Sequence, residues 1–127
     1  YSYKWIGKVL PDFKDRIISS ALNVPVQFGS LMDLTTVFKQ GIDDTKKIND
    51  AVIAASLKFP NLIRIAKDPI VSSDVIGMQE TIIYDEIGTL RIGNNMIKTL
   101  AWYDNGYNHA SRILDVISLY EGLKKWI

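Results

Sequence analysis

The sequence predicts an α+β fold in which a mostly antiparallel sheet is covered by helices and closed by a C-terminal amphipathic helix. Two stretches repeat apolar residues with the period of a helix, and several short stretches of branched and aromatic residues are typical of strands. The gaps between the later strands are of hairpin length, which favours antiparallel pairing. The 127 residues are 47% hydrophobic and 23% charged, an ordinary globular composition, and a single domain, 1–127, is expected.

The first part of the chain is expected to hold a short helix and one or two strands. The helix over residues 2–10 should end before Pro11, because proline cannot continue a helix. Apolar residues alternate over residues 22–34, which predicts one or two half-buried strands. Pro25 and Gly29 interrupt that alternation, so a bend or a sheet edge is expected near them.

Residues 43–59 give the clearest helical pattern, and Pro60 follows it. One stripe at helical spacing consists of Ile48, Ala51, Val52, Ala55 and Phe59. Asp43 and Asp44 stand where an N-cap and a favourable partner for the helix dipole belong. We therefore predict an amphipathic helix in the layer that covers the sheet.

The second half is predicted to contain short strands followed by a closing helix. Strands are expected at residues 62–66, 81–84, 90–92 and 97–103, with turns at Gly88 and at 93–95. Residues 108–127 form a second amphipathic helix, whose apolar face consists of Ile113, Val116, Ile117, Tyr120, Leu123 and Ile127.

Composition and charge exclude several classes of function. The net charge of +1 leaves no broad basic surface for nucleic acid and no polybasic patch for a membrane. The lack of cysteine removes disulfides and a thiol nucleophile, and a single histidine leaves no histidine-rich metal site. No apolar run is long enough to span a bilayer, and the first residues lack the features of a signal peptide, so a cytoplasmic location is expected.

The polar candidates for chemistry each have a structural interpretation beside the functional one. A serine nucleophile would need His109 as its base, but no G-x-S-x-G elbow is present, and Ser72-Ser73-Asp74 is typical of a turn or a helix cap. Asp85-Glu86 could bind a hard cation, although neighbours on a strand point to opposite faces and favour a solvated pair. His109 is either a partly exposed residue or a pocket residue whose charge the helix dipole disfavours.

Three aromatic residues lie close to Asn105 in the sequence: Trp102, Tyr103 and Tyr107. They either pack in the core at a strand end or form one wall of a ligand pocket. Neither G-x-G-x-x-G nor G-x-x-x-x-G-K-[ST] occurs, so the chain has no glycine-rich phosphate cradle of those kinds.

Four segments carry a resemblance to a known family. The segment Trp102-Tyr103-Asp104-Asn105 with Arg112, and Val71-Ser72-Ser73-Asp74 with Ile83-Tyr84-Asp85, resemble signatures of glyceraldehyde-3-phosphate dehydrogenases. Two further motifs of that family are matched in order and spacing by Gly7-Lys8-Val9-Leu10-Pro11 and by Val24-Pro25 with Ser30 and Asp33-Leu34-Thr35. The similarity covers residues 7–120.

The resemblance implies a part of an enzyme. Dehydrogenases of this family combine a Rossmann domain that binds NAD with a catalytic domain, and this chain resembles the later part of the catalytic domain and its closing helix. The Rossmann domain and the segments that carry the family's catalytic cysteine and histidine are absent. The chain alone is therefore expected to contain no catalytic residue, to be inactive and to need no cofactor, whereas a longer two-domain parent would use NAD.

The family's ligand positions are only partly kept. Asn105 falls on the asparagine that binds the nicotinamide carboxamide, and His109, a second cofactor-binding candidate, replaces a tyrosine. Asn23 replaces the arginine that holds the substrate phosphate, and an amide cannot form the bidentate ionic bonds of a guanidinium. Gly106 replaces a glutamate. These replacements weaken the expectation of triose-phosphate binding.

Three hypotheses remain open on the sequence. The chain is the C-terminal piece of a dehydrogenase of this family, or a stand-alone, non-enzymatic relative that acts by oligomerisation or partner binding, or a divergent two-domain enzyme for another aldehyde. The apolar face of residues 113–127 would be exposed without a Rossmann domain, so either that domain or a second copy of the chain is expected to cover it.

Overall fold

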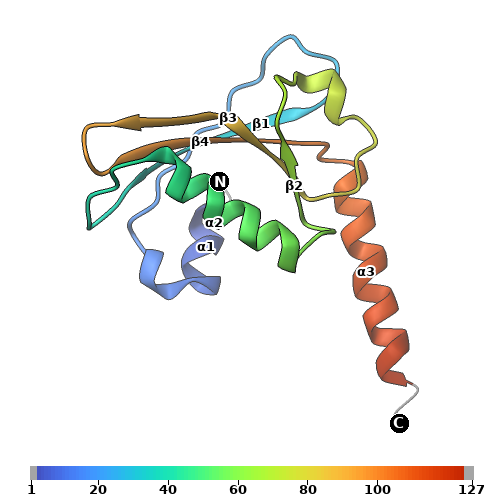
Figure 1. Ribbon diagram of the computed structural model, residues 1–127. Coiled ribbons are helices and arrows are strands. Elements are labelled where there is room, and N and C mark those ends of the chain that lie inside the picture. The colour runs from blue at the N-terminus through green and yellow to red at the C-terminus, as the bar shows by residue number, and fades with distance from the viewer. Residues whose placement is uncertain (1–2, 125–127) are drawn as a thin grey trace.

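The computed structural model describes residues 3–124, and its centre is a four-stranded mixed sheet (Figure 1). The strands are β1 (Ser30–Val37), β2 (Ile63–Ala66), β3 (Ile82–Ile92) and β4 (Met96–Tyr103), in the spatial order β1-β4-β3-β2. β4 pairs antiparallel with β1 and β3, whereas β2 pairs parallel with β3 because residues 67–81 cross over between them. The predicted α+β fold with a mostly antiparallel sheet is confirmed.

Three helices accompany the sheet: α1 (Tyr3–Val9), α2 (Thr45–Lys58) and α3 (Tyr107–Lys124). Two short 3-10 turns, η1 (Pro11–Phe13) and η2 (Ser72–Val75), lie in the connections. α2 packs against β2 and β3, and α1 lies on the same side of the sheet, while α3 extends away from the sheet end (Figure 1). No helix in the described part of the chain is both long and apolar enough to cross a membrane.

The predicted helices are confirmed, with small shifts at their ends. Asp44 is the N-cap of α2, since its Oδ1 accepts the backbone N–H of Lys46 at 2.9 Å. α1 is the predicted helix before Pro11, although Ser2, where it was expected to begin, lies outside the described residues. α3 begins one residue earlier than predicted, at Tyr107.

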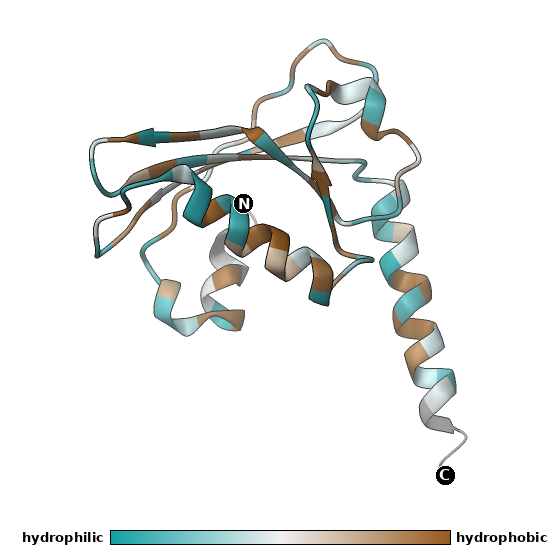
Figure 2. Ribbon diagram, viewed as in Figure 1, coloured by the Kyte–Doolittle hydropathy of each residue, from teal (hydrophilic) through white to brown (hydrophobic). Residues whose placement is uncertain are grey.

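The apolar stripe predicted for the last helix is described as far as Tyr120, because the side chains of Leu123 and Ile127 lie outside the described set. The stripe residues that are described are each about half exposed or more: Ile113, Val116, Ile117 and Tyr120. Leu114 and Leu119, which are outside the stripe, are more exposed than most of it. Figure 2 shows hydrophobic residues recurring along the projecting length of α3.

The two faces of the sheet are covered differently. On one face, the Tyr84 hydroxyl donates to Asn49 Oδ1 of α2 at 2.8 Å. Neighbouring residues of a strand point to opposite faces, so Ile83 lies on the other face. There it joins Ala66 and Val75 in a buried cluster, against which the half-buried residues Ile70, Met78 and Trp102 pack. The crossover that contains η2 therefore covers the sheet end next to α3.

The prediction of two strands at 81–84 and 90–92 with a turn at Gly88 is wrong. Both belong to β3, whose register on β4 shifts between Asp85 and Leu90. The Gly88 N–H donates to Asp85 Oδ1 at 2.9 Å, and a Cβ on Gly88 would lie 2.9 Å from Leu100 Cδ1. Gly88 thus marks a bulge, because β4 pairs with the chain on both sides of it. The turn predicted at 93–95 does connect β3 to β4.

The prediction of strands over residues 22–34 is wrong for its first part. β1 begins only at Ser30 and runs to Val37, and residues 20–29 are irregular and mostly exposed. Gly29 has a φ of +82°, which favours glycine, and a Cβ there would lie 2.5 Å from the Ser72 carbonyl oxygen. Close packing on η2 therefore accompanies a bend at Gly29, in the region where the sequence predicted a bend or a sheet edge.

Candidate functional site

The junction between β4 and α3 is organised by the carboxylate of Asp104. Its Oδ1 accepts the backbone N–H groups of Gly106 and Tyr107, and its Oδ2 accepts the N–H of Gly77, each at 2.9 Å. The first two bonds cap the start of α3. The third joins that helix start to the crossover segment after η2, so one side chain fixes both pieces of backbone.

The charge state of Asp104 follows from these bonds. The hydrogen bond from Gly77, together with those from Tyr107 and Gly106, holds the pKa of Asp104 below its ordinary value of 3.8, against a smaller opposing effect of desolvation. The carboxylate is therefore ionised at neutral pH, as a cap at the positive end of a helix dipole should be.

Asn105 follows this cap and is exposed, as is Gly106. Its backbone is held from both sides, because Asp104 accepts the N–H groups of Gly106 and Tyr107 through its side chain and that of Asn108 through its carbonyl at 3.2 Å. An exposed amide on a fixed backbone can donate one hydrogen bond and accept another, as a ligand with a carboxamide requires.

A second set of contacts fastens α3 to the sheet through Thr81. Asn108 is 6% exposed, and its Nδ2 donates to the Thr81 carbonyl at 2.9 Å. Arg112 Nη1 donates to the Thr81 hydroxyl at 3.2 Å and also to the Asn61 carbonyl. Arg112 Nε is in ion-pair contact with Asp115 Oδ2 at 2.8 Å. These bonds hold only the first turns of α3, and the rest of the helix projects.

An open hollow of about 450 Å³ lies against this end of α3. It is lined by Thr81, Asn108, His109, Arg112, Ile113, Val116 and Ile117. Most of its wall is apolar, with Thr81 and Arg112 at the sheet end. A surface of this kind suits an apolar side-chain cluster better than a small polar substrate.

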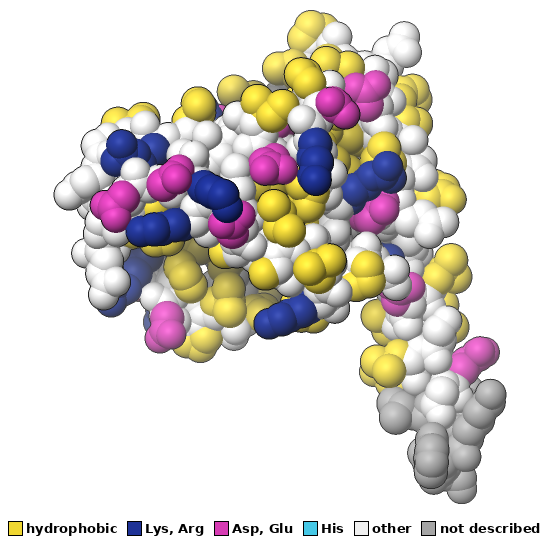
Figure 3. Space-filling model, viewed as in Figure 1, with side chains coloured by type: hydrophobic (Ala, Val, Ile, Leu, Met, Phe, Trp, Pro, Cys, Tyr) yellow, Lys and Arg dark blue, Asp and Glu magenta, His cyan; other side chains and the backbone are white. Residues whose placement is uncertain are grey.

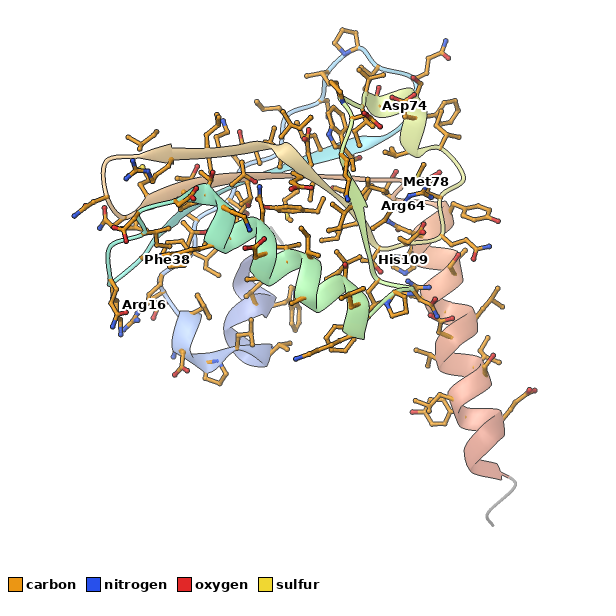
Figure 4. All side chains as sticks on the ribbon, in the orientation of Figure 1. Arg16, Phe38, Arg64, Asp74, Met78 and His109 are labelled. Carbon is orange, nitrogen blue, oxygen red and sulfur yellow. The ribbon has the colours of Figure 1, made fainter. Side chains whose placement is uncertain are left out.

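His109 lies on α3 at the edge of that hollow and is exposed. Figure 4 shows it near the sheet end, apart from Asp74 on the opposite side of the sheet. The structure therefore does not bring His109 together with the Ser72-Ser73-Asp74 segment. That segment forms η2, where Asp74 Oδ2 accepts the Val71 N–H at 2.7 Å, so it is the turn that its composition predicted.

Two of the three aromatic residues near Asn105, Trp102 and Tyr107, lie in different surroundings. Trp102 packs against the buried cluster of Ala66, Val75 and Ile83, which is the core role that was one of its two interpretations. Tyr107 is 47% exposed and lines a second hollow, of about 340 Å³, on another side of α3.

Asp85 and Glu86 accept hydrogen bonds at the bulge of β3. Asp85 accepts the Gly88 N–H and lies 3.5 Å from Trp102 Nε1, and the Glu86 carbonyl accepts from Asn49. Among residues 3–124, no three histidine or acidic side chains gather as a metal ion would require. Figure 3 shows acidic and basic side chains interspersed on the face that it presents.

Asn23, the candidate at the substrate-phosphate position, lies in the irregular segment before β1 and is exposed. It does not line either hollow beside α3. The sequence pointed to Asn105 and His109, and both lie at the start of α3. It did not identify Gly77 and Thr81, which offer backbone or hydroxyl groups to residues distant in the chain. An aspartate just before a helix is a known cap signal, so Asp104 could have been found.

Residues 2–105 match a family model described as glyceraldehyde 3-phosphate dehydrogenase, C-terminal domain. The chain is 36% identical over 116 residues to the glyceraldehyde-3-phosphate dehydrogenase of Borreliella burgdorferi, an alignment that covers 89% of this chain and 34% of that protein. It is 34% identical over 118 residues to glyceraldehyde-3-phosphate dehydrogenase 2 of Streptomyces arenae, covering 91% and 34%.

It is also 31% identical over 116 residues to glyceraldehyde-3-phosphate dehydrogenase 2 of Saccharomyces cerevisiae, covering 90% of this chain and 34% of the yeast protein. The chain thus spans about a third of the length of the curated relatives it matches.

Proposed function

Because the chain belongs to the glyceraldehyde-3-phosphate dehydrogenase family, as a C-terminal domain of it, we propose that it is the closing part of an NAD-dependent, two-domain dehydrogenase and is inactive alone. The rest of the proposal follows the family name: an oxidoreductase of glycolysis that works in the cytoplasm. The single observation that supports a role for one residue concerns Asp104. Its carboxylate accepts the backbone N–H groups of Gly77, Gly106 and Tyr107, which fixes the backbone at Asn105 while that residue stays exposed.

The residues present fit one contact to NAD. Asn105 would hold the nicotinamide carboxamide, since an amide can pair with another amide through one donor and one acceptor. Asp104 would act as a positioning residue, because its three backbone bonds fix the turn that carries Asn105. When bound, NAD supplies the hydride acceptor. The sequence has no glycine-rich cradle for its pyrophosphate, so the remaining contacts would come from a Rossmann domain.

The phosphate position argues for a changed substrate preference. Asn23 is exposed in an irregular segment and carries no charge. An arginine there would supply two charge-assisted hydrogen bonds, which the amide cannot replace. Compared with an enzyme that has arginine at this position, a parent enzyme with Asn23 would therefore bind a phosphorylated aldehyde more weakly. Its affinity for an unphosphorylated aldehyde would fall less.

The exposed apolar side chains of α3 support a proposal about what this helix packs against. Its apolar residues from Ile113 to Tyr120 are about half exposed or more, and a contiguous apolar surface of this kind is seldom left in water. In the two-domain parent, the Rossmann domain would cover it. In the isolated chain, self-association would cover this apolar surface. Light scattering should therefore show a homo-oligomer, and a clean monomer at high concentration would contradict this part of the proposal.

The test uses the complete protein with NAD and glyceraldehyde 3-phosphate. Asn105→Ala should raise the KM for NAD about fivefold, as expected for one hydrogen bond of about 1 kcal/mol. The control is Asn94→Ala, which removes an exposed amide in the turn between β3 and β4. An unchanged KM in Asn105→Ala would reject the cofactor contact. A complete protein that forms no NADH with any aldehyde would reject the proposal as a whole.

The alternative is a stand-alone, non-enzymatic relative that acts by oligomerisation or partner binding. The replacements at Asn23, Gly106 and His109 favour it, because ligand positions drift when catalysis no longer constrains them. A native transcript that encodes only this chain, together with no thermal stabilisation by NAD, would support this alternative. At a hundredfold excess over Kd, a bound ligand should stabilise the fold by about 2.7 kcal/mol.

A further inference from the structure

Asn105 is followed by Gly106, and this is the only Asn-Gly pair in the sequence. Both residues are exposed at the start of α3. A glycine after asparagine leaves the backbone nitrogen open to attack the side-chain amide, because no Cβ shields that nitrogen. The other six asparagines are followed by residues with side chains.

We propose that Asn105 is a site of spontaneous deamidation whose rate is set by the Asp104 cap. In this reaction, the Gly106 backbone nitrogen gives its proton to water and attacks Asn105 Cγ, forming a five-membered succinimide. The amide nitrogen of the side chain leaves as ammonia. Water then opens the ring at either carbonyl and gives aspartate or isoaspartate, so the net change is addition of water and loss of ammonia.

Asp104 opposes the first step in the folded chain. The Gly106 nitrogen that must attack donates its hydrogen to Asp104 Oδ1 at 2.9 Å, and that proton has to leave. The same oxygen holds the N–H of Tyr107, and the Asp104 carbonyl accepts from Asn108, so the backbone is set in a helical turn. Ring closure therefore requires the cap to open first.

The bond between Asp104 Oδ2 and Gly77 makes opening dependent on the crossover segment. Because Gly77 N–H holds the other carboxylate oxygen at 2.9 Å, movement of residues 75–79 loosens the cap. Conversion would remove an amide donor and add a negative charge at a helix start, which the helix dipole tolerates. Isoaspartate would also lengthen the main chain and break the first turn. The chemistry is independent of whether Asn105 contacts NAD.

The experiment follows the purified chain during incubation in mildly alkaline buffer. Peptide mapping by mass spectrometry and labelling with an isoaspartyl methyltransferase give the rate at each asparagine. Asn105 should convert faster than Asn94, which is also exposed in a turn and is followed by Asn95. Asp104→Ala should speed conversion about fivefold, the change in open population that loss of one N-cap of about 1 kcal/mol produces.

Gly106→Ala is the variant that keeps the fold. A Cβ there would meet Asp104 Oδ1 at an ordinary 3.5 Å, and Gly106 is not among the glycines with a left-handed backbone, so alanine can adopt its conformation. It should slow conversion of Asn105 strongly, and retained far-UV circular dichroism would show that the slowing is chemical. Equal rates at Asn105 and Asn94 in the native chain would overturn the proposal. So would an unchanged rate in Asp104→Ala, since the cap would then not control the reaction.

Discussion

Asn108 of α3 donates a hydrogen bond from Nδ2 to the carbonyl oxygen of Thr81 at 2.9 Å, and this bond joins the last helix to the sheet across 27 residues of sequence. Arg112 reaches the hydroxyl of the same threonine one helical turn later. The first two turns of α3 are thus both fastened to Thr81, which is also the residue before β3 begins.

Asn108→Ala should destabilise the chain by about 1–3 kcal/mol, because a nearly buried amide is lost and the Thr81 carbonyl is left without its donor. Chemical denaturation measures the change in the free energy of unfolding. Asn94→Ala, which removes an exposed amide, should change it by less than about 0.5 kcal/mol. Equal effects of the two substitutions would contradict the anchoring role of Asn108.

Tyr84→Phe should cost about 1–3 kcal/mol, since it removes a buried hydroxyl that contacts Thr89 Oγ1 at 2.7 Å and Asn49 Oδ1 at 2.8 Å. Those two groups would remain without their partner beneath α2. Thermal or urea unfolding gives the measurement. Phe38 is half-buried near β1, and its replacement by tyrosine provides a control that adds a hydroxyl away from this network.

The stability of the chain should also fall at alkaline pH because of Tyr84. Burial, as the largest effect, raises the pKa of Tyr84 above its ordinary value of 10.0, although the bond to Thr89 opposes this. A raised folded pKa gives stability that is fully present below pH 10.0 and is lost as the pH rises through the folded pKa. In Tyr84→Phe this part of the alkaline decline should disappear, and an identical decline in both proteins would refute the assignment.

The stability of the chain should fall at acidic pH because of Asp104. The bond from Gly77, with those from Tyr107 and Gly106, lowers its folded pKa below 3.8. A lowered folded pKa gives stability that is present above pH 3.8 and is lost as the pH falls through the folded pKa. Unfolding curves at a series of acidic pH values should show this loss in the original chain and less of it in Asp104→Asn. Asp43→Asn is the matched control, because it changes an exposed carboxylate that forms an ion pair with Lys47.

Gly29→Ala should destabilise the chain more than Gly77→Ala, although both glycines have positive φ, +82° and +74°. Both variants carry the strain of a left-handed residue, about 1–3 kcal/mol. Only at Gly29 would the new Cβ collide with the Ser72 carbonyl, at 2.5 Å, whereas Gly77 has open space around it. Urea unfolding of the two variants isolates the collision, and equal losses would mean that backbone strain alone matters at both positions.

Local patterns predicted the helices and the final hairpin well. The stripe over residues 43–59 with its acidic cap gave α2, and the turn residues at 93–95 gave the β3–β4 connection. These elements depend on residues within a few positions of one another, so their signal is contained in a short window. The motif around Asn105 likewise placed the candidate site at the start of α3.

Local patterns failed where a distant partner sets the backbone. Gly88 is typical of a turn, yet β4 pairs with β3 on both sides of it and makes it a bulge. The alternation before Ser30 is typical of a strand, yet the contact of Gly29 with Ser72 bends the chain there. In each case the deciding contact joins residues well separated in sequence.

The sequence by itself determined the α+β class, the order of the main elements and the family to which the chain belongs, because periodicity, caps and motif spacing are written in neighbouring residues. Only the tertiary structure decided that β2 lies parallel to β3, that Asp104 holds Gly77 as well as its own helix, and that α3 leaves the sheet after its anchor on Thr81. The physical reason is that these features depend on hydrogen bonds between groups distant in the chain. The type of a residue does not specify which distant group its backbone N–H or carbonyl will bind.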